Sequence, residues 1–192
     1  MADEDETTNS WFAKDHEQRR QEIRDDLKKK ALELQARGDS EASLTESDDA
    51  LSESIKLLGF EGSAARVLDL LPLVLVSWAD GEVQHGERKT ILDVLAGRGI
   101  KPGDDAWMLM ETLLEKPPPE AYVDECLSVL RALRVKYGSG TGGVVQLCLK
   151  VAEASGGLFG IGSVSDSERT TLHSVAVALG GKAEKRFQRL LG

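Results

Sequence analysis

Two stretches of the chain match one another when the sequence is shifted by 81 residues. The aligned pairs are Val83 with Val164, Glu87-Arg88 with Glu168-Arg169, Thr90 with Thr171, Ile91 with Leu172, Val94 with Val175 and Gly99 with Gly180. A very apolar segment precedes each copy, at residues 67–79 and 144–154. An internal repeat of this kind marks a repeated structural unit. We therefore expect a duplicated helix-turn-helix hairpin whose two copies pack as one helical domain.

The spacing of apolar residues along the whole chain is helical, and no run alternates in the manner of a strand. Glycine or proline stands at most of the joins between apolar segments. This pattern predicts an all-α protein, with helices near residues 11–37, 50–58, 63–79, 86–98, 103–116, 119–137, 143–154, 166–179 and 182–191.

The first 49 residues differ in composition from the rest. They read as an acidic tail, a charged helical arm and a linker rich in Ser, Asp and Glu, whereas residues 50–192 are densely apolar and form the predicted domain. Few apolar residues interrupt the charges of the arm, so it cannot build a core by itself. We expect the arm to be peripheral or to dock on a partner through Trp11, Phe12, Ile23 and Leu27.

Composition narrows the class of protein. A net charge of −9 disfavours binding to nucleic-acid phosphates. The longest apolar run, residues 70–79, is far shorter than the roughly 20 residues that span a bilayer. The acidic start of the chain is the opposite of a secretory signal. We expect a cytoplasmic protein without a transmembrane segment, with Cys126 and Cys148 as reduced core thiols.

The stretches "LVSWADGEVQHGERKTILDVLAGRGI" and "VAEASGGLFGIGSVSDSERTTLHSVAVALGG" carry a resemblance to a known family. Each has a buried-type helix, a polar turn, a Glu and then an amphipathic helix. Together they resemble the tellurite-resistance TerB family and the related amino-terminal domain of the DjlA co-chaperones. The resemblance covers about residues 55–192, and the chain has no His-Pro-Asp triplet, so no J domain is expected.

The resemblance implies a TerB-like helical bundle with acidic residues on the turns between helices, which the family is proposed to use for a divalent cation. It further implies a role in bacterial stress responses through membrane-linked or chaperone complexes, without enzymatic activity. The second copy has Ser155 and Ser163 where the first has Asp80 and Glu82. Two symmetric acidic sites are therefore not expected.

The acidic turn of the first copy has two interpretations. Asp80, Glu82 and Glu87 place three carboxylates around one turn, and oxygen ligands suit Ca²⁺ or Mg²⁺. Alternatively, Gly81 ends one helix in a left-handed conformation and Glu87 caps the next helix, which explains the repeated Glu without a metal. Neither a nucleophile nor an oxyanion donor adjoins the turn, so we expect no enzyme activity.

The glycine-rich segment 155–163 holds Leu158 and Phe159 between two predicted helices. These side chains either fold back over the core or form an apolar contact for a protein partner or a membrane surface. The combined prediction is a non-enzymatic binding or scaffold module of a stress-response system, acting through protein partners. The alternative is a structural subunit of a larger assembly that docks through its N-terminal arm.

Overall fold

The computed structural model of the chain describes residues 2–37, 44, 47–137, 148, 151, 166–180 and 185. The elements are α1 (Ala2–Arg37), α3 (Asp48–Leu57), the 3₁₀ helix η1 (Gly62–Leu70), α4 (Leu71–Ser77), α5 (His85–Gly97), α6 (Asp105–Glu115), α7 (Glu120–Tyr137) and α9 (Asp166–Leu179). None of the described residues lies in a strand. The predicted all-α class is therefore confirmed for this part of the chain.

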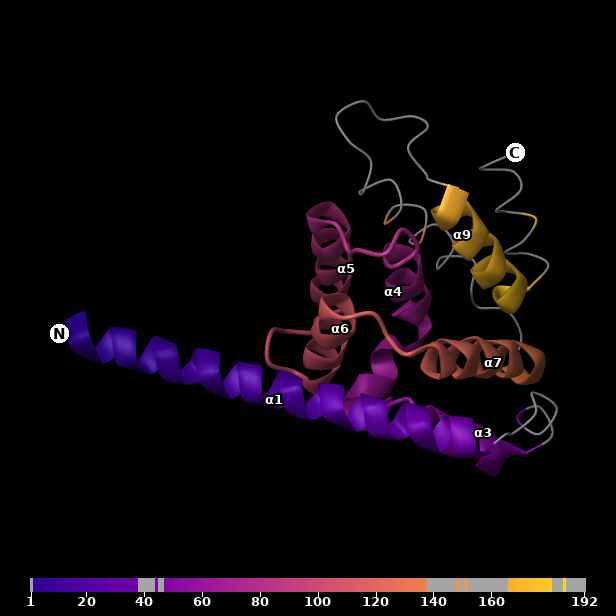
Figure 1. Cartoon of the computed structure of the whole chain (residues 1–192), viewed down its shortest axis with the longest axis horizontal. Helices are drawn as coiled ribbons and strands as arrows, with labels where there is room; N and C mark the ends of the chain where they lie inside the picture. Colours follow the sequence, from indigo (N-terminus) through magenta and orange to yellow (C-terminus); the bar gives the residue numbers. More distant parts are fainter. Residues whose placement is uncertain are drawn as a thin grey trace.

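The long helix α1 lies along one side of a body formed by the other helices (Figure 1). At 1.5 Å per residue its 36 residues measure about 54 Å. Its second half contacts α6 and α7, whereas its N-terminal part extends beyond the body (Figure 1). The helix begins at Ala2, so the acidic residues expected to form a tail are its first turns.

Helix α4 forms the centre of the body. All seven of its residues are buried, and it contacts η1, α5, α6 and α9. Its apolar character on every side, which predicts a buried helix, is thus matched by neighbours on every side. Two hydrogen bonds tie the layers together. Trp78 Nε1, just after α4, donates to the carbonyl of Leu113 at 2.8 Å, and the buried Tyr122 hydroxyl donates to the carbonyl of Leu58 at 2.8 Å.

The single helix predicted over 63–79 is divided in two. A 3₁₀ segment runs to Leu70, and a regular α-helix starts at Leu71 with Pro72 in its first turn. Proline has no backbone N–H and fits the first turn of a helix, so a new helix starts there readily. Periodicity alone does not separate the two segments, because both bury the same kind of side chain.

The repeat predicted from the sequence is seen in part. Ile91 and Leu172, which the repeat aligns, are both buried, and Gly99 and Gly180 both have positive φ angles, 74° and 90°. The predicted helices 143–154 and 182–191 lie outside the described residues, apart from Cys148, Val151 and Lys185. The TerB-like arrangement of two hairpins therefore stays a prediction.

The second half of α1 shares the core of the domain that was predicted to begin at residue 50. Leu27 and Ala31 are buried, and Ile23 and Leu34 pack against the same apolar cluster as the helices of the body. These residues follow a spacing of three or four, which gives α1 one apolar stripe. Residues 23–34 are thus structurally part of the domain.

Candidate functional site

The acidic turn between α4 and α5 is held by its own hydrogen bonds. Asp80 Oδ1 accepts from the Glu82 N–H at 3.3 Å, and Glu82 Oε1 accepts from Gln84 Nε2 at 2.6 Å. Gly81 has a φ of 97°, and its N–H donates to the Trp78 carbonyl. The predicted left-handed glycine at the end of the first helix is confirmed.

Glu87 has the predicted capping role. Its carboxylate Oε2 accepts from the backbone N–H of Gln84 at 2.8 Å and closes a capping box at the start of α5. The residue is buried, with 1% of its surface exposed. Across the part of the chain that the structure describes, no group of three or more His, Cys, Asp or Glu side chains is placed to hold a metal ion. Binding of Ca²⁺ or Mg²⁺ by Asp80, Glu82 and Glu87 stays a prediction from the sequence.

The residues predicted to bind a partner lie in different parts of the structure. Leu27 is buried and Ile23 is partly buried in the core of the chain itself, so these two side chains hold α1 on its own domain. Trp11 and Phe12 lie in the N-terminal third of α1, and their side chains are outside the described part of the structure. Leu158 and Phe159 lie outside the described residues.

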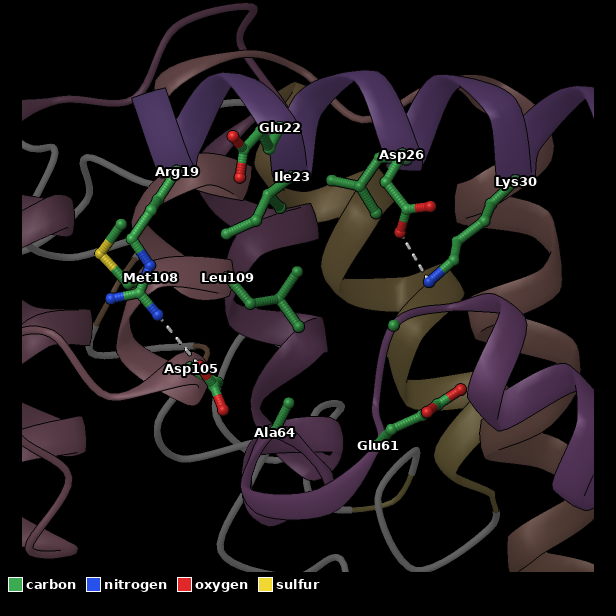
Figure 2. A pocket seen from close by; sticks show the side chains of 12 residues that line it. Arg19, Glu22, Ile23, Asp26, Lys30, Glu61, Ala64, Asp105, Met108 and Leu109 are labelled. Atoms are coloured by element: carbon green, nitrogen blue, oxygen red, sulfur yellow. Dashed lines mark hydrogen bonds and ion pairs between the residues drawn. The ribbon is translucent and has the colours of Figure 1, made fainter. Parts of the chain in front are cut away.

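A cleft of about 420 Å³ opens between α1, the segment 59–64 and α6, and we call it the α1–α6 cleft (Figure 2). Its lining residues are Arg19, Glu22, Ile23, Asp26, Leu27, Lys30, Gly59, Glu61, Ala64, Asp105, Met108 and Leu109. Apolar side chains form the floor, where Ile23 from α1 faces Leu109 from α6, and charged side chains form the rim (Figure 2). A concave apolar surface with a few polar groups at its edge is the usual form of a binding site.

The rim charges divide into paired and unpaired groups. Lys30 Nζ lies 2.8 Å from Asp26 Oδ2, and Arg19 Nη2 lies 3.5 Å from Asp105 Oδ1 across the mouth of the cleft (Figure 2). Glu22 accepts a hydrogen bond from Gln18 at 3.1 Å. Within the described ranges, no cation lies at ion-pair distance from Glu22 or Glu61. The cleft is therefore acidic overall, with four carboxylates against two cations.

Beside the cleft, a network of ion pairs fixes α1 to the end of α6. Arg24 Nη1 lies 2.8 Å from Glu115 Oε2, and Arg20 Nη1 lies 2.9 Å from Glu115 Oε1. Both arginines also bind Glu17, at 2.6 and 2.7 Å. These hydrogen bonds lower the pKa of Glu17 below its ordinary value of 4.5. Arg88 of α5 approaches Glu115 Oε1 at 3.8 Å.

Glu115 stands at the last position of α6, where the helix dipole disfavours a negative charge. The arginines that converge on it offset this cost. Because Arg24 is only 9% exposed, its interactions are screened less than those of a surface pair. The wall of the cleft that α1 contributes is therefore held in place by buried charge as well as by apolar packing.

The sequence pointed to Ile23 and Leu27 but not to the cleft that they line. The signal was present in the spacing of the apolar positions of α1, which predicts one face able to pack on a neighbour. The neighbouring walls come from residues about 30 to 90 positions later in the chain. No local pattern links those residues to α1.

Comparisons with family models, curated proteins and solved structures found no match to this chain. Membership of the TerB family thus stays a prediction from the resemblance. Among the helices that the structure describes, none has both the length and the apolar character required to cross a membrane.

Proposed function

We propose that the chain is a non-enzymatic binding module that holds a short basic segment of a protein partner in the α1–α6 cleft. The observation that supports this proposal is the placement of Glu22 and Glu61. These two carboxylates lie on different walls, one on α1 and one before η1, with the apolar floor between them (Figure 2). A segment with an apolar side chain flanked by Lys or Arg is complementary to that arrangement.

The expected binding free energy depends on how far the floor and the rim of the cleft are exposed to solvent. Burying one large apolar side chain on the floor contributes about 1.5–3 kcal/mol. Each rim pair with Glu22 or Glu61 contributes about 0–1 kcal/mol, because both carboxylates are open to solvent. The complex is therefore expected to be transient and to weaken with salt, since the pairs are screened. Participation in a stress response of the tellurite-resistance type is part of the proposal and rests on the sequence resemblance.

Selection from a library of short random peptides on the immobilised full chain tests this function. The expected enrichment is for an apolar residue with Lys or Arg on both sides. The double variant Glu22→Lys/Glu61→Lys reverses both free rim charges and is expected to weaken binding of the selected peptides by about tenfold or more.

A matched control separates the cleft from general charge. Asp15→Lys/Glu120→Lys makes the same change in net charge at exposed positions of α1 and α7 outside the cleft. This control is expected to bind the peptides nearly as well as the unmodified chain. Equal losses in both double variants, or selection of peptides without basic residues, would refute the proposed site.

The projecting part of α1 supports a second candidate function, that of a structural subunit. Isolated helices are marginal in water, and the N-terminal part of α1 extends beyond the body of the other helices (Figure 1). A partner that covers Trp11 and Phe12 would stabilise this part. Removal of residues 1–12 is then expected to abolish assembly, measured by light scattering of the reconstituted complex, while peptide binding in the cleft persists.

A further inference from the structure

A second cavity of about 440 Å³ lies on another side of the body, and we call it the α4–α9 groove. It is formed by the end of α4, the turn between α6 and α7, and the sides of α7 and α9, and α9 contacts both α4 and α7 (Figure 1). Its lining residues are Leu75, Trp78, Ala79, Pro117, Pro118, Val123, Leu127, Thr170, Thr171, Ser174 and Val175. Its volume falls within the usual range for small-molecule sites.

The α4–α9 groove differs from the α1–α6 cleft in charge. Among the described residues that line the groove, none carries a charge, although 30% of the chain is Asp, Glu, Lys or Arg. A charged ligand would lose hydration on entry and gain no ion pair from this lining. The groove is therefore matched to an uncharged molecule.

The α9 wall supplies the polar groups of the groove. The Thr170 hydroxyl donates to the Asp166 carbonyl at 2.9 Å, and the Ser174 hydroxyl donates to the Thr170 carbonyl at 3.1 Å. A hydroxyl that has donated its hydrogen keeps lone pairs on its oxygen and acts as an acceptor. This wall therefore favours a ligand that carries a hydrogen-bond donor, such as a neutral hydroxyl or amide N–H.

The opposite walls are apolar and held in place. The Trp78 indole is fixed by its hydrogen bond to the Leu113 carbonyl, and Leu75 of α4 is buried. Pro117 and Pro118 have restricted backbones. A preformed apolar surface binds a ligand with less loss of side-chain freedom than a mobile one.

We propose that the α4–α9 groove binds an uncharged, mainly apolar small molecule that carries a hydroxyl or amide donor. Hydroxyl groups line one side of the groove, and an indole and two prolines line the other. A ligand in the groove would therefore contact polar groups on one side and apolar groups on the other. The occupant and the residues are separate from those of the α1–α6 cleft, so either proposal stands or falls without the other.

The test uses the full chain and two fluorescent probes of similar size, the neutral N-phenyl-1-naphthylamine and the anionic 1-anilinonaphthalene-8-sulfonate. The neutral probe carries an N–H donor and is expected to bind with increased fluorescence. Neutral 1-decanol is expected to displace it, and decanoate is not. Equal binding of both probes, or no binding of the neutral one, would overturn the proposal.

Two variants locate the bound probe. Ser174→Phe fills the groove and is expected to reduce affinity for N-phenyl-1-naphthylamine by about tenfold or more. Ser167→Phe adds the same side chain at an exposed position of α9 outside the groove and is expected to leave affinity unchanged. Thr170→Phe is the second filling variant if Ser174→Phe does not fold. Unchanged binding in a folded filling variant, or capture of only an apolar peptide by the groove, would contradict the assignment.

Discussion

Arg24 and Glu115 are 91 positions apart in the sequence and lie 2.8 Å apart between Nη1 and Oε2. Through this pair a highly charged helix is fixed to the end of α6. The same guanidinium donates from Nε to Gln21 at 3.0 Å and from Nη2 to Glu17 at 2.6 Å. A fork of several N–H donors suits arginine, whereas lysine offers one ammonium group. The position of α1, and with it one wall of the α1–α6 cleft, depends on this side chain.

Arg24→Met is predicted to destabilise the chain by about 2–4 kcal/mol, because it leaves the partly buried Glu115 without its closest cation. Urea unfolding followed by circular dichroism measures the change. Arg19→Met is the control, since the Arg19–Asp105 pair is exposed and 3.5 Å long, and it is expected to cost less than about 1 kcal/mol. Similar losses in both variants would show that burial of Arg24 is unimportant.

Acid is predicted to weaken the attachment of α1 through Glu17. Its pKa is lowered in the folded chain by hydrogen bonds from Arg20 and Arg24. A lowered pKa stabilises the fold above the ordinary value of 4.5 and ceases to do so as the pH falls through the folded-state value. The melting-temperature difference between the unmodified chain and Glu17→Gln should therefore be greatest above pH 4.5 and shrink below it. A difference that is constant with pH would contradict the assigned ion pairs.

Helix positions could be predicted from the sequence because their determinants are local. The spacing of apolar residues predicts the positions of α5 and α6. Gly81 has the left-handed conformation that is expected of a glycine at the end of a helix. Glu87 was assigned to a cap from its distance to the start of α5, and the hydrogen bond to the Gln84 N–H agrees. Each of these features depends on residues within one or two helical turns.

The cleft and the groove were not predictable in this way. Glu22 and Glu61 line one cavity because α1 packs beside the segment before η1. The residues next to each of them in the sequence contain no pattern that predicts this packing. The sequence predicts a charged arm that cannot build a core by itself, whereas Arg24 of that arm is buried against Glu115. Identifying a buried charge requires knowing its partner, which here is far along the chain.

The capping role of Glu87 leads to a prediction on the acidic turn. Glu87→Ala removes the acceptor for the Gln84 N–H and is expected to cost about 0.5–2 kcal/mol in urea unfolding, with Glu87→Gln costing less because glutamine also fits this position. If the turn serves only to cap α5, Ca²⁺ and Mg²⁺ leave the melting temperature of the chain unchanged. A rise that is lost in Glu82→Gln would instead establish the cation site.

The two cysteines are predicted to be unreactive in the folded chain. Cys126 and Cys148 are free and fully buried, and burial raises the pKa of both thiols. Since the thiolate is the reactive form, Ellman's reagent at neutral pH is expected to react slowly with the native chain and rapidly with both cysteines in urea. Fast reaction of either thiol without denaturant would show that its surroundings open.

The free energy of unfolding is predicted to respond with opposite signs to alanine at Gly81, before α5, and at Gly97, the last residue of α5. Gly81 has a φ of 97°, which alanine adopts only with strain, although a Cβ added there would lie in open space. Gly97 ends α5 without a positive φ and also has room for a methyl group. Gly81→Ala is expected to lose about 1 kcal/mol and Gly97→Ala to gain about 0.5 kcal/mol, measured by urea unfolding. Because neither added methyl group meets another atom within 4 Å, backbone conformation alone separates the two variants. A lower free energy of unfolding in both variants would show that packing, and not backbone conformation, causes the effect.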